Sequence, residues 1–302
     1  MHAFGLEETN DFAAVEATGR RAVELNPRDP WAIHAVAHVM EMQGRLPDGI
    51  GWLDQRTDDW PPENMFAFHN WWHFSLFHLD LGDTARVLDI YDSRTHPETT
   101  DVAPELLDAS SLLWRLYLRE VDVGQRWKNL AGSWGSIPEG GFYAFNDLHA
   151  MMAFTATGRQ METRDLLKKI ESSAAGVDTN AMMSREVALP LCRALLAFAD
   201  GDYGKCVGLI ESVRPHANRF GGSNAQRDVI SLTQVEAALR GGLVSTARSL
   251  AAERTNYKPS SPFNWQLTVR VLDLGGDSAG AEQIRSQAAA LVDQSTRARV
   301  GV

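Results

Sequence analysis

Cysteine is scarce in this sequence, and so is any concentration of positive charge. The 302 residues include two cysteines, Cys192 and Cys206, too few for a disulfide framework or a zinc knuckle. We expect both to be reduced thiols in a core. The 29 Lys and Arg residues are outnumbered by 39 Asp and Glu residues, and the formal net charge is −10. Because no basic cluster offsets that charge, a nucleic-acid partner is not expected.

The sequence also lacks a long apolar run and a secretory leader. No run approaches the roughly 20 apolar residues that a membrane-spanning helix needs. The opening residues, MHAFGLEETNDF, have neither the basic nor the apolar region of a signal peptide. We therefore expect a cytoplasmic protein with no membrane partner. No helix start signal precedes Phe4 and Leu6, so we also expect an upstream helical region that this sequence does not contain.

Signals for β-strands and for common catalytic motifs are absent as well. No Val/Ile/Thr-rich alternating run is bounded by hairpin turns. There is no G-x-G-x-x-G after a strand, no Walker loop and no G-x-S-x-G motif. The zinc-protease signature H-E-x-x-H is missing because Ala35 follows His34. Motifs alone therefore leave open whether the protein is an enzyme.

What the sequence does contain is helical periodicity, interrupted at regular intervals. The interruptions each follow one apolar helical run and precede another, and they fall at Gly44, Gly82, Gly158, Gly201, Gly241 and Gly275. Glycine suits the left-handed position that ends a helix. Most spacings are 34 to 43 residues, and the one from Gly82 to Gly158 is twice 38. A further turn, without glycine, is therefore expected near residues 120–122.

Helical pairs at this spacing predict an all-α fold, an α-solenoid of about seven helical hairpins. The first helices of the pairs are expected to begin near residues 30, 65, 104, 142, 183, 223 and 262, after a helix at 11–25. In such a solenoid each hairpin packs only on its neighbours. Because no long linker interrupts the pattern, residues 1–302 are expected to form a single helical repeat domain. Pro190 is expected to kink its helix.

Two copies of H-x-x-x-H occupy equivalent places in adjacent repeats. HAVAH covers residues 34–38 and HNWWH covers residues 69–73, so the offset from 34 to 69, and from 38 to 73, is 35 residues. Residues four apart share a helix face. We therefore predict that His34, His38, His69 and His73 converge on one concave surface, within bridging distance of one ion, water or ligand. Glu41 lies on the same helix face as His34 and His38.

Such a cluster suits a divalent metal ion, because imidazoles four residues apart can reach one ion together. Glu41 follows His38 by three residues, which reverses the Glu-x-x-His order of di-iron helical bundles. The alternative is that the two histidine pairs point into separate cores between helices, where each pair only packs against its neighbours. The neighbouring aromatic residues, Trp72 among them, also favour packing over a stacking platform.

The later first helices carry further polar side chains near their N-terminal halves. These are Asp108 in the third, Asn146 and His149 in the fourth, and Asn224, Arg227 and Asp228 in the sixth. Asp147 and His149 are also candidates for an acid–base pair. The alternative for Arg227 and Asp228 is a buried ion pair that holds the last repeats together. His78 lies on the opposite helix face from His69 and is left out of the predicted site.

Six separate stretches resemble the tetratricopeptide repeat protein 38 family, in that family's order and over residues 2 to about 270. They are HAVAHVMEMQGR, HNWWHFSLFHLDLGD with the following IYD, VGQRW, FNDLH, REVALPLC and GGSNAQRDV. RRAVELNPRDP is similar to the junction of two tetratricopeptide units. The resemblance implies a right-handed, all-helical superhelix of tetratricopeptide-like repeats, and additional helical sequence upstream. It implies no settled reaction.

The sequence therefore favours a binding protein whose polar, histidine-rich groove holds a specific small ligand or a peptide. Arg227 would pair with a carboxylate, the histidines would form hydrogen bonds, and Trp72 would wall the site. A hydrolytic or metal-assisted enzyme using the same groove is the first alternative, and a protein–protein scaffold is the second. Nothing in the sequence indicates the oligomeric state.

Overall fold

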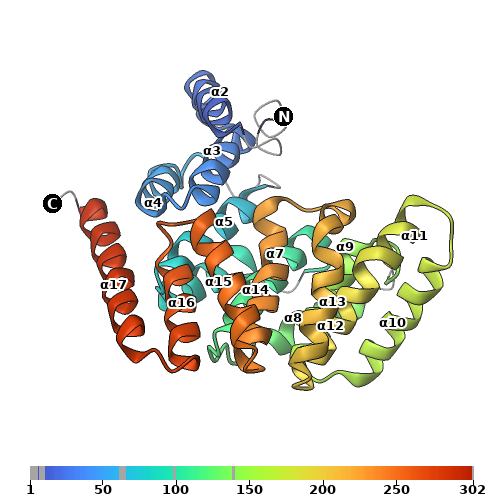
Figure 1. Ribbon diagram of the computed structural model, residues 1–302. Coiled ribbons are helices and arrows are strands. Elements are labelled where there is room, and N and C mark those ends of the chain that lie inside the picture. Colours follow the sequence, from blue (N-terminus) through green and yellow to red (C-terminus); the bar gives the residue numbers. More distant parts are fainter. Residues whose placement is uncertain (1–5, 7–10, 61–65, 98–99, 138–139, 301–302) are drawn as a thin grey trace. The chain divides into compact units, whose positions relative to one another are not determined.

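The computed structural model describes residue 6 and residues 11–60, 66–97, 100–137 and 140–300 (Figure 1). Every regular element in these ranges is helical, which confirms the all-α prediction. None of the described helices combines the length and the apolar character needed to cross a membrane. The sequence-based expectations for Phe4 and for a helix start at residue 65 fall outside these ranges.

The chain forms two compact units, and each is described by itself. Unit 1 comprises residues 1–97 and 251–302, and unit 2 comprises residues 98–250. The single repeat domain and the seven-hairpin solenoid stay predictions. Helices begin at Pro30, Ala103, Ala144, Asn224 and Pro262, each within two residues of an expected start. The start expected near residue 183 is not found, because Met183 instead ends a short helix that begins at Thr179.

Unit 1 is built from helical hairpins contributed by both ends of the chain. Its N-terminal helices are α2 (Phe12–Leu25), α3 (Pro30–Met42), α4 (Leu46–Asp54), α5 (Ala67–Asp80) and α6 (Thr84–Ile90), followed by a π-helical turn, Tyr91–Thr95. After α15 (Val244–Tyr257), which spans the boundary with unit 2, its C-terminal helices are α16 (Pro262–Leu274) and α17 (Ser278–Val300). α16 and α17 pack side by side (Figure 1). The apolar core lies among α3, α4 and α5, where Trp60 stacks on Trp71 with ring centroids 4.9 Å apart.

Polar contacts join the two chain ends within unit 1. The Lys258 ammonium lies 2.5 Å from Glu41 Oε1, and both side chains are about nine-tenths buried. Ser261 Oγ donates a hydrogen bond to Asp80 Oδ1 at 2.6 Å. α17 also contacts α4. The expectation that each hairpin packs only on its neighbours is therefore wrong for this unit.

Unit 2 contains the middle of the chain. Its helices are α7 (Ala103–Leu118), α8 (Arg126–Ser136), α9 (Ala144–Ala156), α10 (Gln160–Ala174), α11 (Thr179–Met183), α12 (Leu189–Ala199), α13 (Tyr203–Val213) and α14 (Asn224–Arg240). A π-helical turn, Ser184–Ala188, precedes α12, and a 3₁₀ segment, Arg214–Phe220, precedes α14. Pro190, predicted to kink its helix, lies in the first turn of α12, directly after the π-helical turn. Cys192 and Cys206 are buried free thiols, as expected.

Helices far apart in sequence also meet inside unit 2. Trp114 Nε1 on α7 donates to Thr233 Oγ1 on α14 at 3.0 Å. The Arg115 guanidinium on α7 donates to the Ala225 carbonyl at 2.7 Å. These buried hydrogen bonds join the first hairpin of the unit to α14, so neighbour-only packing does not hold here either.

The turn without glycine is found where the spacing placed it. α7 ends at Leu118, α8 begins at Arg126, and Glu120 between them has φ 58°. It is the one non-glycine residue with positive φ in the described ranges. The equivalent turn after α3 has Gly44, with φ 67°. Glu120 thus adopts a left-handed conformation that disfavours a side chain.

Two glycines of α4 provide a test of the packing between α4 and α5. A Cβ atom at Gly49 would lie 2.2 Å from Cζ of the buried Phe77 ring, whereas one at Gly51 would have no atom within 4 Å. We expect Gly49→Ala to lower the free energy of unfolding by about 1–3 kcal/mol through overpacking. Gly51→Ala should raise it by up to about 1 kcal/mol through helix propensity. Urea unfolding of both variants measures this, and a gain in stability for Gly49→Ala would contradict the packing.

Candidate metal centre

Helices α3 and α5 of unit 1 carry the four clustered histidines. α3 begins at Pro30 because Asp29 caps it, accepting hydrogen bonds from the backbone N–H groups of Trp31 and Ala32 at 3.0 and 3.1 Å. Asn70 on α5 donates through Nδ2 to the Pro30 carbonyl at 3.3 Å. This buried interhelical bond holds α5 in register against the N-terminal turn of α3.

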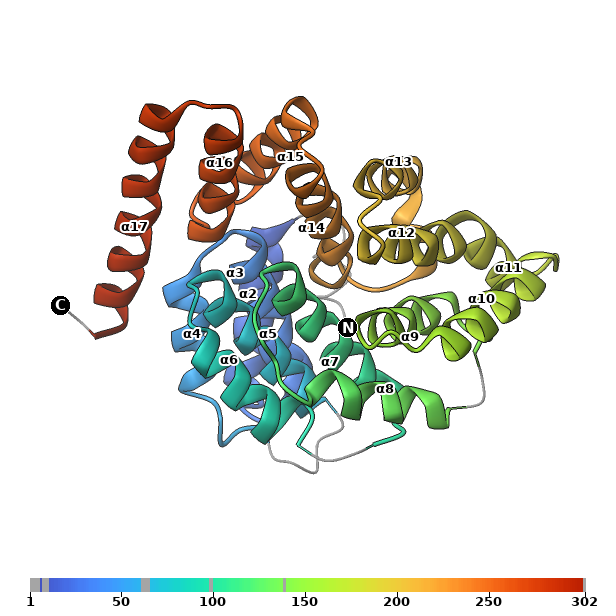
Figure 2. The same ribbon diagram turned by 90° about the horizontal axis from the view of Figure 1, so that it is seen from below.

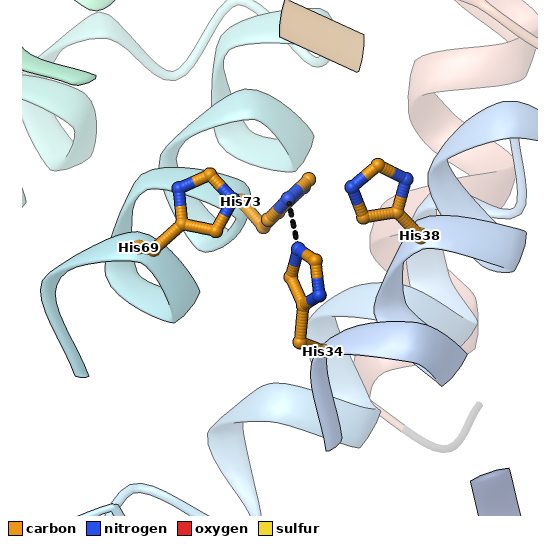
Figure 3. Close-up of side chains that lie close together, drawn as sticks. All are labelled: His34, His38, His69 and His73. Carbon is orange, nitrogen blue, oxygen red and sulfur yellow. Dashed lines mark hydrogen bonds between the residues drawn. The ribbon is translucent and has the colours of Figure 1, made fainter. Parts of the chain in front are cut away.

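With that register, the two histidine pairs face each other (Figure 3). His34 and His38 come from α3, and His69 and His73 come from α5. One ring nitrogen of each residue can be chosen so that all four lie within 4.8 Å of one another. The Nε2 atoms of His34 and His73 are 3.0 Å apart. The two pairs therefore converge within bridging distance of one ion, as predicted, but at a buried position and not on the expected concave surface.

The cluster is buried rather than open to solvent. The four histidines are between 0 and 7 % exposed. The Trp72 ring, fully buried, stacks on His69 with centroids 5.2 Å apart and an interplanar angle of 11°. Phe66 meets His34 edge-on, with centroids 4.8 Å apart. Trp72 was expected to wall the site, and its ring lies directly against one of the four imidazoles.

Burial favours the neutral form of the His34 and His73 imidazoles. It lowers the pKa of His34 well below the usual value, and the neighbouring His38 and His69 lower that pKa further. The pKa of His73 is lowered for the same reasons, with an additional contribution from the positive charge of Lys258. A neutral imidazole has one N–H and one lone pair, so the 3.0 Å contact between His34 and His73 joins a donor to an acceptor.

The donor set fits a transition metal ion. Zinc binds histidine nitrogen at about 2.0–2.1 Å, so ligand nitrogens in a tetrahedral site are about 3.3 Å apart. The cluster lies near this size, with 3.0 Å between one pair of nitrogens and at most 4.8 Å between any chosen two. His73 Nδ1 is also buried and has no hydrogen-bond partner within the described part of the chain. Small rotations of the rings would bring four ring nitrogens to one ion.

Glu41, which shares the helix face of His34 and His38, has a basic partner from the C-terminal part of unit 1. It forms the buried ion pair with Lys258, while its second oxygen, Oε2, is buried with no hydrogen-bond partner in the described ranges. The group of potential ligands that meet at one point consists of the four histidines. Lys258 was not anticipated, because a partner 217 residues away leaves no signal in a local sequence pattern.

The remaining predicted site residues belong to unit 2. Asp108 is buried in α7, Asn146 and His149 lie on α9, and Asn224, Arg227 and Asp228 lie in the first turns of α14. Arg227 donates to Asn224 Oδ1 at 2.8 Å and also to the Gly222 carbonyl. His149 Nδ1 donates to the Phe145 carbonyl at 2.8 Å. The Arg227 guanidinium thus forms hydrogen bonds with residues at the N-terminus of its own helix. The His149 ring forms a hydrogen bond with the backbone of its own helix.

Burial moves the pKa values of Asp147 and His149 in opposite directions. It raises the pKa of Asp147 to about 6, although the Gly141 N–H donates to Oδ1 at 2.7 Å. It lowers the pKa of His149 to about 4, despite the Phe145 carbonyl, and the charge of Arg115 lowers it further. At neutral pH His149 is therefore uncharged and Asp147 is mostly ionised.

No protein family model matches the chain.

The pKa of His149 predicts a pH-dependent stability. Unfolded, this histidine binds a proton near pH 6.5, but folded it does so only near pH 4. Between these values the unfolded state holds more protons, so the histidine lowers the free energy of unfolding as pH falls, by about 3 kcal/mol in total. His149→Gln should therefore become less destabilising, relative to wild type, by about that amount from pH 7 to pH 4.

Denaturant unfolding at both pH values measures the effect, and a penalty that is the same at both would contradict it. Asp147→Asn is the opposite control. Because the folded-state pKa of Asp147 is raised, its contribution to stability is present below the unfolded value near 3.8 and is lost as pH rises through about 6. Its substitution should thus cost more at pH 4 than at pH 7.

Proposed function

We propose that unit 1 binds a divalent transition metal ion through His34, His38, His69 and His73. The observation that carries this proposal is the buried meeting of four ring nitrogens, all within 4.8 Å of one another. Neutral imidazole nitrogen suits zinc, copper, nickel and iron better than magnesium or calcium, which prefer oxygen ligands. The lowered pKa values of His34 and His73 support this reading, since a metal ligand must give up its proton.

The geometry favours a closed, stabilising site over a catalytic one. Four protein ligands fill the tetrahedral coordination of zinc, whereas catalytic zinc keeps a position for water or substrate. The enclosed position also suits an ion better than the peptide or small molecule first expected in an open groove. A bound ion would replace the weak contact between His34 and His73 and would join α3 to α5.

We also propose that the helical pairs are tetratricopeptide-like repeats of a cytoplasmic protein related to the tetratricopeptide repeat protein 38 family. Support comes from the six sequence stretches and from the repeated helix–turn–helix order along both units. In this proposal the histidine pairs are a feature of two adjacent repeats, which turns a general packing scaffold into a specific binding protein.

Metal analysis of the purified chain tests the proposed centre. We expect about one equivalent of zinc or another transition metal per chain, and tight rebinding of Zn²⁺ after chelation, but no binding of Mg²⁺. His73→Ala should weaken Zn²⁺ binding on the order of 100-fold, because one of four ligands supplies about a quarter of a typical zinc binding energy. Calorimetric titration gives the affinities, and Zn²⁺ should raise the melting temperature of the wild type.

The matched control is His78→Gln on the same helix. His78 is buried and contacts Asp83 Oδ2 through Nδ1 at 3.2 Å, but it is not part of the cluster. This variant should keep wild-type affinity for Zn²⁺. Failure of the wild type to bind any transition metal, or an equal loss in both variants, would overturn the proposal.

A further inference from the structure

Unit 2 contains a cavity that the proposed metal centre does not use. Its volume is about 300 Å³, the lower end of the range for small-molecule sites. Its lining residues come from α8, α9 and α10 and from the segment at the start of α7. Within this group α9 packs against both α8 and α10, and Figure 2 shows α9 beside α10. Aromatic rings form much of its wall, namely Trp134, Phe142, Tyr143 and Phe154. Phe142 is 76 % exposed, which is unusual for a large apolar side chain at the edge of a cavity.

The carboxylate of Asp147 in this wall has one buried oxygen without a hydrogen-bond partner among the described residues. Asp147 is 2 % exposed, and its Oδ1 accepts a hydrogen bond from the Gly141 N–H. Its other oxygen, Oδ2, is buried and has no hydrogen-bond partner in the described ranges. Burial of an ionised carboxylate costs free energy unless a cation or further donors compensate it.

Within the described part of the chain, the other charged groups of the wall form no hydrogen bond or ion pair with Asp147 Oδ2. Glu162 lies 3.4 Å from Arg159, and Asp165 lies 3.8 Å from Lys168, so each has its own basic neighbour. Asp101 is exposed to solvent. Among the described residues of the wall, Lys169 is the one cation. It is exposed, and its charge acts on Asp147 less strongly than the Gly141 N–H does.

We propose that this cavity binds a small organic cation, a primary or methylated amine, with the Asp147 carboxylate as its counter-ion. The aromatic rings would complete the site, because ammonium groups are attracted to the faces of Trp and Tyr rings. Asn146, which also lines the cavity, offers a side-chain carbonyl to an N–H group. The assignment is independent of the metal centre in unit 1.

Calorimetric titration of the full chain with n-butylammonium and with tetramethylammonium tests the proposal. Butyrate and butyramide are matched probes that replace the positive charge with a negative one or with none. We expect both cations to bind, butyramide to bind at least tenfold more weakly, and butyrate not to bind. Equal affinity for butyramide, tighter binding of butyrate, or no binding of either cation would overturn the assignment.

Variants then locate the site. Asp147→Asn keeps the shape of the side chain and removes its charge, and it should lower affinity for n-butylammonium about tenfold or more. Asp165→Asn removes one charge from the exposed edge of the same cavity and should change affinity less than about threefold. Phe142→Ala, at an exposed position that does not support the core, should weaken binding severalfold and keeps the test valid if Asp147→Asn folds poorly. Unchanged affinity in Asp147→Asn and Phe142→Ala would contradict the assignment.

Discussion

The burial of four imidazole rings in one small volume is the constraint on which the rest of unit 1 depends. Four positive charges so close together, and away from water, would repel one another strongly. The lowered pKa values of His34 and His73 reflect this constraint. The register of α3 against α5, held by Asn70 and Pro30, brings those nitrogens together. A slip of α5 by one helical turn would move His69 and His73 about 5.4 Å along α5 relative to His34 and His38, and only one histidine of each helix would then face a partner. The chemistry of the cluster therefore depends on the register of α3 against α5.

Burial shifts the pKa values of the two candidate sites in opposite directions, because it disfavours a positive charge on histidine and a negative charge on aspartate. In unit 1 it removes the charge from imidazoles and leaves lone pairs that suit a metal ion. In unit 2 it raises the pKa of Asp147, yet a value of about 6 still leaves the carboxylate mostly ionised at neutral pH. That carboxylate needs a compensating positive charge, whereas the histidines need an acceptor for their electron pairs. The same physical effect thus points to two different classes of ligand.

Local pattern made much of the fold predictable. Turn residues gave the breaks between helices, and the equal offset of the two histidine pairs gave their convergence, because both depend on positions within one repeat. The turn at Glu120 was predictable from the repeat spacing, although the residue with positive φ is not a glycine. Contacts between distant segments were not predictable. Lys258 with Glu41, and Trp114 with Thr233, join residues more than 100 positions apart, and neither pair has a recognisable spacing. The unpartnered oxygen of Asp147 is likewise a property of packing.

The ion pair between Glu41 and Lys258 also bears on the order in which the protein is made. During synthesis the ribosome releases α3 and α5 long before residue 258, so the N-terminal part of unit 1 waits for its last helices while all of unit 2 is being translated. Until then Glu41 has no ammonium partner, and the α4 surface that contacts α17 is uncovered. Unit 2, which is continuous in sequence, has every segment it needs to fold earlier. We therefore expect the discontinuous unit to complete its folding after unit 2.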